Sequence, residues 1–251
     1  AGLIFVPLDK EIIVYIILVV AAMFTGYLDD AAKTPWGEYK KGLLDLLLAV
    51  LVALNYLTYN PATVEFMLFN VTVTMPVIVF AILVVILVWA SINVTNCADG
   101  VDGLSGTLTI ITLLTIYGIF KIKDNLGSIS FLILLFCVCI LGYLWYNANP
   151  SRMLMGDAGS RAMGIFIAIA ILKTGSPVLY LLVAAVLILD GGLGLVKVAL
   201  LRFLKIKILK NTRTPLHDHT RKNMGWSGSQ TVVRFAIIQI MISLATLYLI
   251  A

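Results

Sequence analysis

Long apolar runs separated by short polar loops constrain this chain more than any other feature. They lie at about 11–28, 43–59, 76–95, 104–120, 129–146, 161–173, 177–200 and 231–251. Because a helical span needs about 20 apolar residues, the chain is expected to form eight membrane helices, with the 161–173 run short enough to be tilted or partly buried. Of the 251 residues, 61% are hydrophobic and 12% charged, about half the charge of a soluble domain. The predicted fold class is all-α, a polytopic integral membrane helix bundle forming one domain over residues 1–251.

Alternation of these helices across the membrane predicts which loops share a face. The loops of the first face lie near 29–42, 91–104, 147–161 and 201–230. Of the 18 Lys and Arg residues, fourteen fall on this face. The four on the other side are Lys10, Lys121, Lys123 and Lys173. An excess of Lys and Arg is typical of cytoplasmic loops, so the first face is predicted to be cytoplasmic. The net charge of +5 is therefore no signal of nucleic-acid binding, and no nucleic-acid partner is expected.

The polar stretch 93–106 follows directly on an apolar run. Its asparagines and aspartates recur at every third position, at Asn93, Asn96, Asp99 and Asp102. On a helix these side chains would form one slowly rotating polar stripe. Three glycines, at 100, 103 and 106, let the backbone approach a bound group. Because acidic residues at membrane depth are costly and usually functional, we interpret the stretch as a binding site rather than as a polar helix end with a glycine cap.

A pair of adjacent carboxylates, Asp29 and Asp30, ends the first apolar run. Like charges this close repel, so their presence indicates a cation or a basic partner. Magnesium takes oxygen ligands, commonly one or two carboxylates, and leaves other positions to substrate phosphates. Lys33 lies one helical turn after Asp29 and could contact a phosphate. The alternative is a solvated helix end with an ordinary ion pair.

Two further loops carry chemistry. Asp157 stands between Gly156 and Gly159 at the start of an apolar run. Free backbone N–H groups there can bind an anion, and the carboxylate can bind a metal. A plain helix cap is the alternative.

His217 and His219 flank an acid. They could bind metal, orient a pyrophosphate or transfer protons. The alternative is two exposed loop histidines. The basic segment 202–210 is typical of a segment at an anionic lipid surface.

Four motifs, in order, resemble those of the polyprenyl-phosphate N-acetylhexosamine-1-phosphate transferase family. They are the paired-aspartate segment 29–33, the Asn-rich segment 93–104 with two Asp-Gly pairs, the Met-Gly-Asp-Ala-Gly-Ser segment 155–160, and the C-terminal segments 215–219, 225–227 and 232–235. The resemblance covers about residues 24 to 240. The C-terminal segments are similar to the branch that uses UDP-MurNAc-pentapeptide.

The resemblance implies a magnesium-dependent transferase of peptidoglycan synthesis. It would transfer phospho-MurNAc-pentapeptide from UDP-MurNAc-pentapeptide to undecaprenyl phosphate, giving lipid I and UMP. Asp157 would hold Mg²⁺ with the help of Asp29 or Asp30, and Asp29 is also the candidate for the base or lipid-phosphate partner. His217 and His219 would lie near the pyrophosphate. The substrate-binding candidates are Lys33, Asn93, Asn96, Asp99, Gly100, Asp102, Asn147 and Leu154.

The family comparison also implies features beyond the site. The family has about ten helices, so we expect at least one membrane helix before residue 1, with residues 1–5 as a remnant of a Gly-Gly start of the second helix. A multi-pass protein of the bacterial inner (plasma) membrane, a homodimer and sensitivity to nucleoside inhibitors are expected. The chain departs from the family at three positions. Asp218 stands where the family often has the middle of three histidines, and Leu154 stands where an aromatic residue commonly lies beside the uracil. Lys197 lies near a position often held by glutamine.

Two other functions compete with this interpretation. A sister enzyme would use UDP-GlcNAc in place of the muramoyl substrate. A transporter or ion channel would spread its acids through the membrane depth and contain internal repeats. Only Asp45 and Asp190 lie away from helix ends, which favours an enzyme with its acids on one face.

Overall fold

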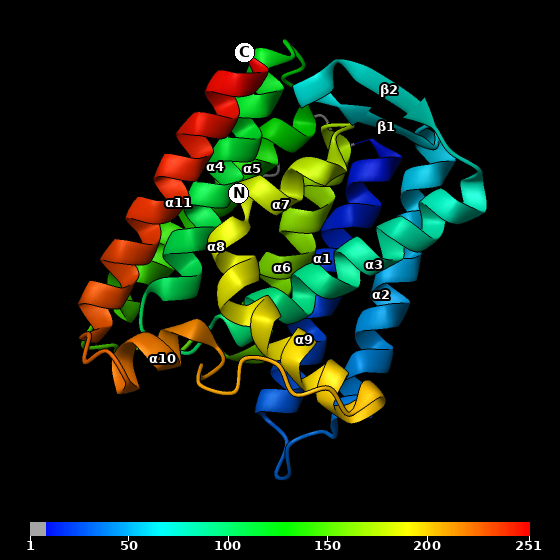
Figure 1. The fold of residues 1–251 in the computed structure, drawn as a ribbon. Helices are drawn as coiled ribbons and strands as arrows, with labels where there is room; N and C mark the ends of the chain where they lie inside the picture. The colour runs from blue at the N-terminus through cyan, green and yellow to red at the C-terminus, as the bar shows by residue number, and fades with distance from the viewer. Residues whose placement is uncertain (1–8) are drawn as a thin grey trace.

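A computed structural model describes residues 9–251 as a bundle of long helices (Figure 1). The long helices are α1 (Lys10–Asp30), α2 (Glu38–Tyr59), α3 (Val77–Cys97), α4 (Leu104–Ile122), α5 (Ser128–Asn147), α6 (Gly156–Lys173) and α11 (Gly228–Ile250). The shorter ones are η2 (Met67–Phe69), η3 (Pro177–Leu179), α7 (Tyr180–Val183), α8 (Ala185–Leu187), η4 (Ile188–Gly192), α9 (Leu193–Ala199), η5 (Leu200–Leu204) and α10 (Leu216–Lys222). The prediction of an all-α membrane bundle is confirmed. The expected remnant at residues 1–5 lies outside the described residues.

The number of spans differs from the eight predicted. Within residues 9–251, six helices are long and apolar enough to cross a membrane, namely α1 to α5 and α11. The 161–173 run forms α6, but every residue of α6 from Ser160 to Leu172 is buried by other helices. Arg161, within the buried stretch, pairs with Asp45, while Asp157 and Lys173 lie near the two ends of α6. Helix α6 is therefore not a simple apolar span.

The 177–200 run also departs from the prediction, because it is a broken helix. Its two parts, 177–183 and 185–204, meet at an angle of 74° and count as a seventh span only if taken together. The break frees backbone groups that must be satisfied at membrane depth. Gln239 of α11 does this: its side chain donates to the carbonyl of Val183 at 3.0 Å and accepts from the amide of Val186 at 2.9 Å.

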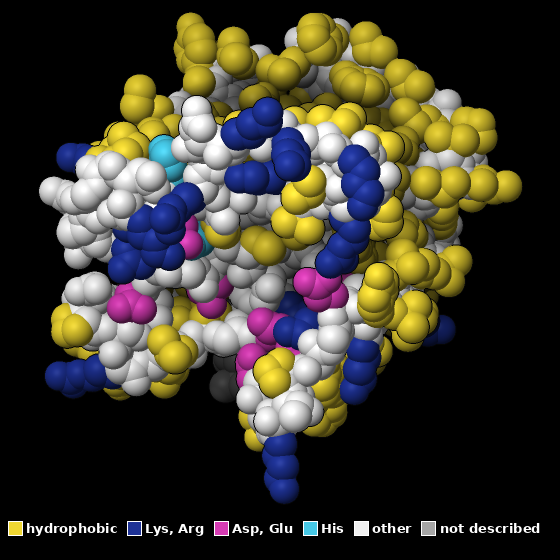
Figure 2. Space-filling model, turned by 60° about the horizontal axis from the view of Figure 1, so that its bottom comes forward, with side chains coloured by type: hydrophobic (Ala, Val, Ile, Leu, Met, Phe, Trp, Pro, Cys, Tyr) yellow, Lys and Arg dark blue, Asp and Glu magenta, His cyan; other side chains and the backbone are white. Residues whose placement is uncertain are grey.

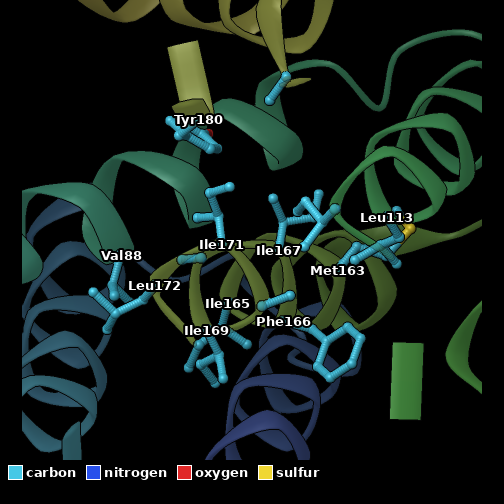
Figure 3. Packing of buried hydrophobic residues seen from close by; sticks show 14 of the residues in the cluster. Val88, Leu113, Met163, Ile165, Phe166, Ile167, Ile169, Ile171, Leu172 and Tyr180 are labelled. Carbon is cyan, nitrogen blue, oxygen red and sulfur yellow. The ribbon is translucent and has the colours of Figure 1, made fainter. Parts of the chain in front are cut away.

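Helix α6 is the centre of the molecule, as Figure 3 shows for its apolar side chains. Val88 of α3, Leu113 of α4 and Tyr180 of α7 pack around it. Helix α6 crosses α3 closely at Gly164, where an added Cβ would lie 2.6 Å from both the Ser91 carbonyl oxygen and the Ile92 Cα. The Ser91 hydroxyl donates to the Gly164 carbonyl at 2.7 Å. Small residues let membrane helices approach this closely.

The loops gather at the two ends of the bundle as alternation predicted. The 31–37 loop and α10 lie at the lower end in Figure 1. The loop between α3 and α4 lies beside the loop between α5 and α6, because Asn96 bonds Asp157 and Gly103 bonds Asn147. The upper end carries an antiparallel hairpin of β1 (Thr63–Phe66) and β2 (Val71–Thr74), which the sequence analysis did not predict. Strand β1 is tied to the end of α6 by the Glu65 amide, which donates to the Gly175 carbonyl at 2.9 Å.

Two helical glycines offer a direct test of this packing. Alanine is the better helix former by about 0.5–1 kcal/mol, and Gly142 of α5 has nothing within 4 Å of its added Cβ. Gly142→Ala is therefore expected to be neutral or slightly stabilising. Gly164→Ala must push α3 and α6 apart and should cost about 1–3 kcal/mol. The midpoints of thermal unfolding in detergent check this, and equal midpoints for the two variants would contradict the described crossing.

Candidate active site

The centre of the lower face is a lysine held between two carboxylates from different helices. Asp29 is the next-to-last residue of α1, Lys41 lies in the first turn of α2, and Asp157 is the second residue of α6. The Lys41 ammonium forms ion pairs with Asp29 and, at 3.0 Å, with Asp157. The Trp36 amide donates to Asp29 at 2.7 Å, so the short loop after α1 fixes this carboxylate. Asp29 is buried, whereas Asp157 is partly open to the face.

Asp30 has a different role from its neighbour. Its two carboxylate oxygens accept from the amides of Asp157 at 3.2 Å and Ala158 at 3.1 Å. An anion at the N-terminus of a helix satisfies free N–H groups and interacts favourably with the helix dipole. Gly26 permits this arrangement, because a side chain there would clash with the Asp157 backbone. Asp30 thus fixes the start of α6, and with it Asp157, against α1.

The two asparagines of the Asn-rich segment separate. Asn96 donates to Asp157 at 2.8 Å and to the Ser160 hydroxyl at 2.9 Å, so it contacts the group around Lys41 through Asp157. Asn93 instead donates to Asp45 at 3.4 Å and to the Trp89 carbonyl at 2.9 Å. Asn93 therefore faces the buried region beside the site rather than the open face.

Asp99 lies in the turn between α3 and α4 and accepts a hydrogen bond from the Ser105 hydroxyl. Burial raises the pKa of its carboxyl to about 6, partly opposed by the Ser105 hydrogen bond, and the charge of Asp157 adds to the increase. Asp102 is partly buried in the same turn and Gly100 is exposed. This turn therefore presents both an exposed backbone and a carboxyl group that is costly to ionise.

Asn147 connects this turn to the loop before α6. Its side-chain oxygen accepts from the Gly103 amide at 2.7 Å, and its amide nitrogen donates to the Met153 carbonyl at 2.8 Å. Because the side chain is buried and forms hydrogen bonds on both sides, Asn147 holds the two loops together. Leu154, in the same loop, is 80% exposed and stands at the rim.

The two histidines occupy different environments. His217, at the start of α10, is buried and pairs with Asp190 at 2.8 Å. Its ring lies against Gly100, so the structure brings it to the turn between α3 and α4. His219 is partly buried, and its Nδ1 accepts from the Arg213 amide at 3.3 Å. Asp218, between them, points to Lys222 at 2.7 Å.

Two residues of the site, Lys41 and Asp190, are not among those predicted from the sequence. Lys33, the predicted phosphate contact, is exposed in the 31–37 loop, and Lys41 is the lysine that contacts the acids. A signal for Lys41 was present, because it precedes the 43–59 run at the same membrane boundary as Asp29. Asp190 was recognised only as an acid away from helix ends, and no spacing pattern connects it to His217.

Figure 2 shows the site from the open side: acidic side chains surround a hollow and Lys and Arg side chains border it. In residues 9–251, no three His, Cys, Asp or Glu side chains form a metal-binding group. Asp29 and Asp157 nevertheless reach the same ammonium group, so both can contact one cation. Magnesium commonly takes one or two carboxylates and completes its shell with phosphate oxygens and water. These two residues fit that requirement, whereas both oxygens of Asp30 bond backbone amides.

The two acids away from helix ends each have a buried hydrogen-bonding partner. Asp45 of α2 accepts from Arg161 of α6 at 2.6 and 3.1 Å, with both side chains almost fully buried. Asp190 pairs with His217 as described. These acids therefore hold helices together instead of lining a pathway across the membrane, which argues against the transporter interpretation.

Comparison with known proteins gives consistent results. The sequence pattern of glycosyl transferase family 4 matches residues 12–175. A phospho-N-acetylmuramoyl-pentapeptide-transferase of Treponema pallidum (strain Nichols) is 40% identical over 250 residues, covering 92% of this chain and 69% of the relative. A protein of the same name from Helicobacter hepaticus is 30% identical over 51% of this chain and 34% of its own length. Another, from Borreliella burgdorferi (strain ZS7), is 35% identical over 42% of this chain and 29% of its own length.

The raised pKa of Asp99 predicts a pH-dependent stability. A carboxyl whose pKa rises from 3.8 to about 6 on folding stabilises the fold below pH 4, and this contribution is lost as the pH rises through 6. Asp99→Asn cannot ionise and can still accept from Ser105. We expect it to be more stable than the wild type at pH 8 by about 1–3 kcal/mol, with the difference disappearing near pH 4.

Asp218→Asn is the matched control, because the Lys222 ammonium lowers the pKa of Asp218. A lowered pKa contributes stability above the unfolded value, so this variant should lose about 0–1 kcal/mol at pH 8. The midpoints of unfolding of both variants and the wild type, measured between pH 4 and pH 8, show how each stability difference depends on pH. A gain for Asp99→Asn that does not change with pH would contradict the argument from ionisation.

Proposed function

Since the chain belongs to glycosyl transferase family 4, we propose that it is a phospho-N-acetylmuramoyl-pentapeptide-transferase of peptidoglycan synthesis. It transfers phospho-MurNAc-pentapeptide from UDP-MurNAc-pentapeptide to undecaprenyl phosphate, and the products are lipid I and UMP. The observation that carries this proposal is the junction of Asp29, Lys41 and Asp157, where three helices place two carboxylates and an ammonium at one end of a membrane bundle.

The reaction breaks the pyrophosphate bond of the donor and forms a new one between the sugar phosphate and the lipid phosphate. Such transfers depend mainly on positioning and on neutralising negative charge at phosphate oxygens. Lys41 would supply a positive charge at the junction, and Asp29 would accept a proton or orient the lipid phosphate. His217 would approach the donor pyrophosphate from the Gly100 side of the pocket, and the turn from Asp99 to Asp102 would contact the nucleoside.

Magnesium is part of this proposal. When bound by Asp157 and Asp29, it would neutralise the phosphates and polarise them toward transfer. Because Lys41 already contacts both carboxylates, this side chain must share them with the metal or move toward a phosphate oxygen. The junction can accommodate either arrangement, since Lys41 is partly exposed.

The chain is a multi-pass membrane protein. We further propose that it lies in the bacterial inner membrane with the junction facing the cytoplasm, where its charge distribution and a nucleotide substrate would place it. A homodimer and inhibition by nucleoside compounds belong to the same proposal and follow from the family resemblance.

The decisive measurement is release of UMP by purified protein in detergent with undecaprenyl phosphate and magnesium. We expect turnover with UDP-MurNAc-pentapeptide and little with UDP-GlcNAc. EDTA should abolish it, and Asp157→Ala should reduce it at least about 100-fold, because the variant loses a metal ligand and the Lys41 and Asn96 contacts. Turnover with UDP-GlcNAc alone would assign the chain to the sister activity. If folded protein releases no UMP with either substrate, the proposal is refuted.

Lys41 and Lys33 provide a matched pair within the same loop region. Lys41→Gln removes the charge between Asp29 and Asp157, so kcat should fall by about 100-fold or more. Lys33→Gln removes an exposed charge and should change kcat less than about threefold, since an exposed charge in water is weakly coupled. Steady-state UMP release measures both. A larger loss for Lys33→Gln would restore Lys33 as the principal phosphate contact.

A further inference from the structure

Asp190 has no role in the reaction outlined above, yet it forms a buried pair with His217. Asp190 is fully buried, and His217 is 3% exposed. One carboxylate oxygen accepts from the His217 backbone amide at 2.7 Å, and the other contacts the ring Nδ1 at 2.8 Å. The same carboxylate thus fixes both the start of α10 and the rotation of the imidazole ring.

This contact decides which ring nitrogen faces the substrate. A carboxylate can only accept, so the hydrogen of a neutral imidazole must reside on Nδ1. Nε2 then has a free lone pair, and it is the nitrogen nearest to Gly100, where an added Cβ would overlap it. Gly100 is exposed. Nε2 is therefore the ring atom that faces the turn between α3 and α4.

The backbone around Asp190 is built to permit this placement. Asp190 lies in η4, a π-helical turn, and such turns often occur at functional sites. The next residue, Gly191, lies so close to α3 that an added Cβ would clash with the Val94 carbonyl oxygen. The turn and the glycine bring the carboxylate to α10 from within the second part of the broken helix, three residues before α9 begins.

We infer that Asp190 is a positioning residue, which holds His217 in the Nδ1–H tautomer and presents Nε2 to the phosphates of the nucleotide substrate. This inference rests on the proposed function for the identity of the substrate, although the tautomer itself does not. In a site of this type, a carboxylate that sets the tautomer acts on the reaction only through its histidine.

The tautomer can be measured directly, because the chain contains only two histidines. Protein with ¹⁵N-labelled imidazole rings in detergent at pH 8 gives two sets of long-range ¹H–¹⁵N correlations, and the set missing from His217→Gln belongs to His217. We expect hydrogen on Nδ1 and none on Nε2. Hydrogen on Nε2 with Nδ1 bare would overturn the inference, whatever the activity of the protein.

A double-mutant cycle tests whether Asp190 acts through His217. Asp190→Asn keeps the size of the side chain, but its amide can donate to Nδ1 and so favours hydrogen on Nε2. We expect kcat/KM for UDP-MurNAc-pentapeptide to fall about 100-fold, in the lower range of contributions from a positioned acid–base group. In a His217→Ala background, Asp190→Asn should cause no more than about a twofold further loss. A further loss as large as that in the wild-type background would indicate a structural role and overturn the inference.

Asp218→Asn is the matched control, since Asp218 lies beside His217 in sequence but pairs with Lys222. It should leave kcat/KM within about twofold of the wild type. The wild-type assay also separates the two hypotheses. A wild-type protein that releases no UMP would refute the proposed function, while the NMR result would still decide the tautomer.

Discussion

The ion pair between Arg161 and Asp45 is the interaction on which the placement of the other groups depends. Removing one partner from a buried pair leaves an unpaired charge, at a cost of about 3–5 kcal/mol. The Arg161 guanidinium forms two hydrogen bonds with Asp45 and a third, at 3.3 Å, with the Lys41 carbonyl. It therefore joins α6 to α2 one helical turn from Asp157 and beside the backbone of Lys41. The register of α6 against α2, and hence the meeting of Asp157 with Lys41, follows from this pair.

Helix α6 is a membrane-protein element without a lipid-facing surface. Its backbone contacts α3 through Gly164, and its first turn contacts α1 through Gly26. These crossings leave little freedom for Asp157 to move, because both neighbouring contacts involve main-chain atoms. A reaction that depends on positioning charges near phosphates benefits from such a rigid base. The exposed loops can then differ in sequence without displacing the central carboxylate.

The sequence alone predicted the helices that face lipid and the loops that share one end, because apolar length and alternation are local properties. It could not predict that the 161–173 run would be wholly enclosed, since enclosure depends on which helices surround it. The same limitation explains Lys41 and Asp190. Lys33 was chosen because it lies one turn from Asp29, whereas Lys41 reaches Asp29 through the reversal between α1 and α2. Asp190 meets His217 across 27 residues, and no motif specifies that contact.

Depth in the membrane gives the same chemical group two different uses in this protein. Carboxylates within the bundle, at Asp45 and Asp190, are paired with a cationic or ring-nitrogen donor, because an unpaired charge there would be too costly. At the helix ends, Asp99 and Asp157 are partly exposed, and Asp29, although buried, shares the partly exposed Lys41 ammonium with Asp157. The buried pairs each support an element of the site: Arg161 holds the start of α6, and Asp190 holds His217 against the turn between α3 and α4. The inner acids thus act on the site through structure, and the outer acids are the ones free to meet a metal ion or a phosphate.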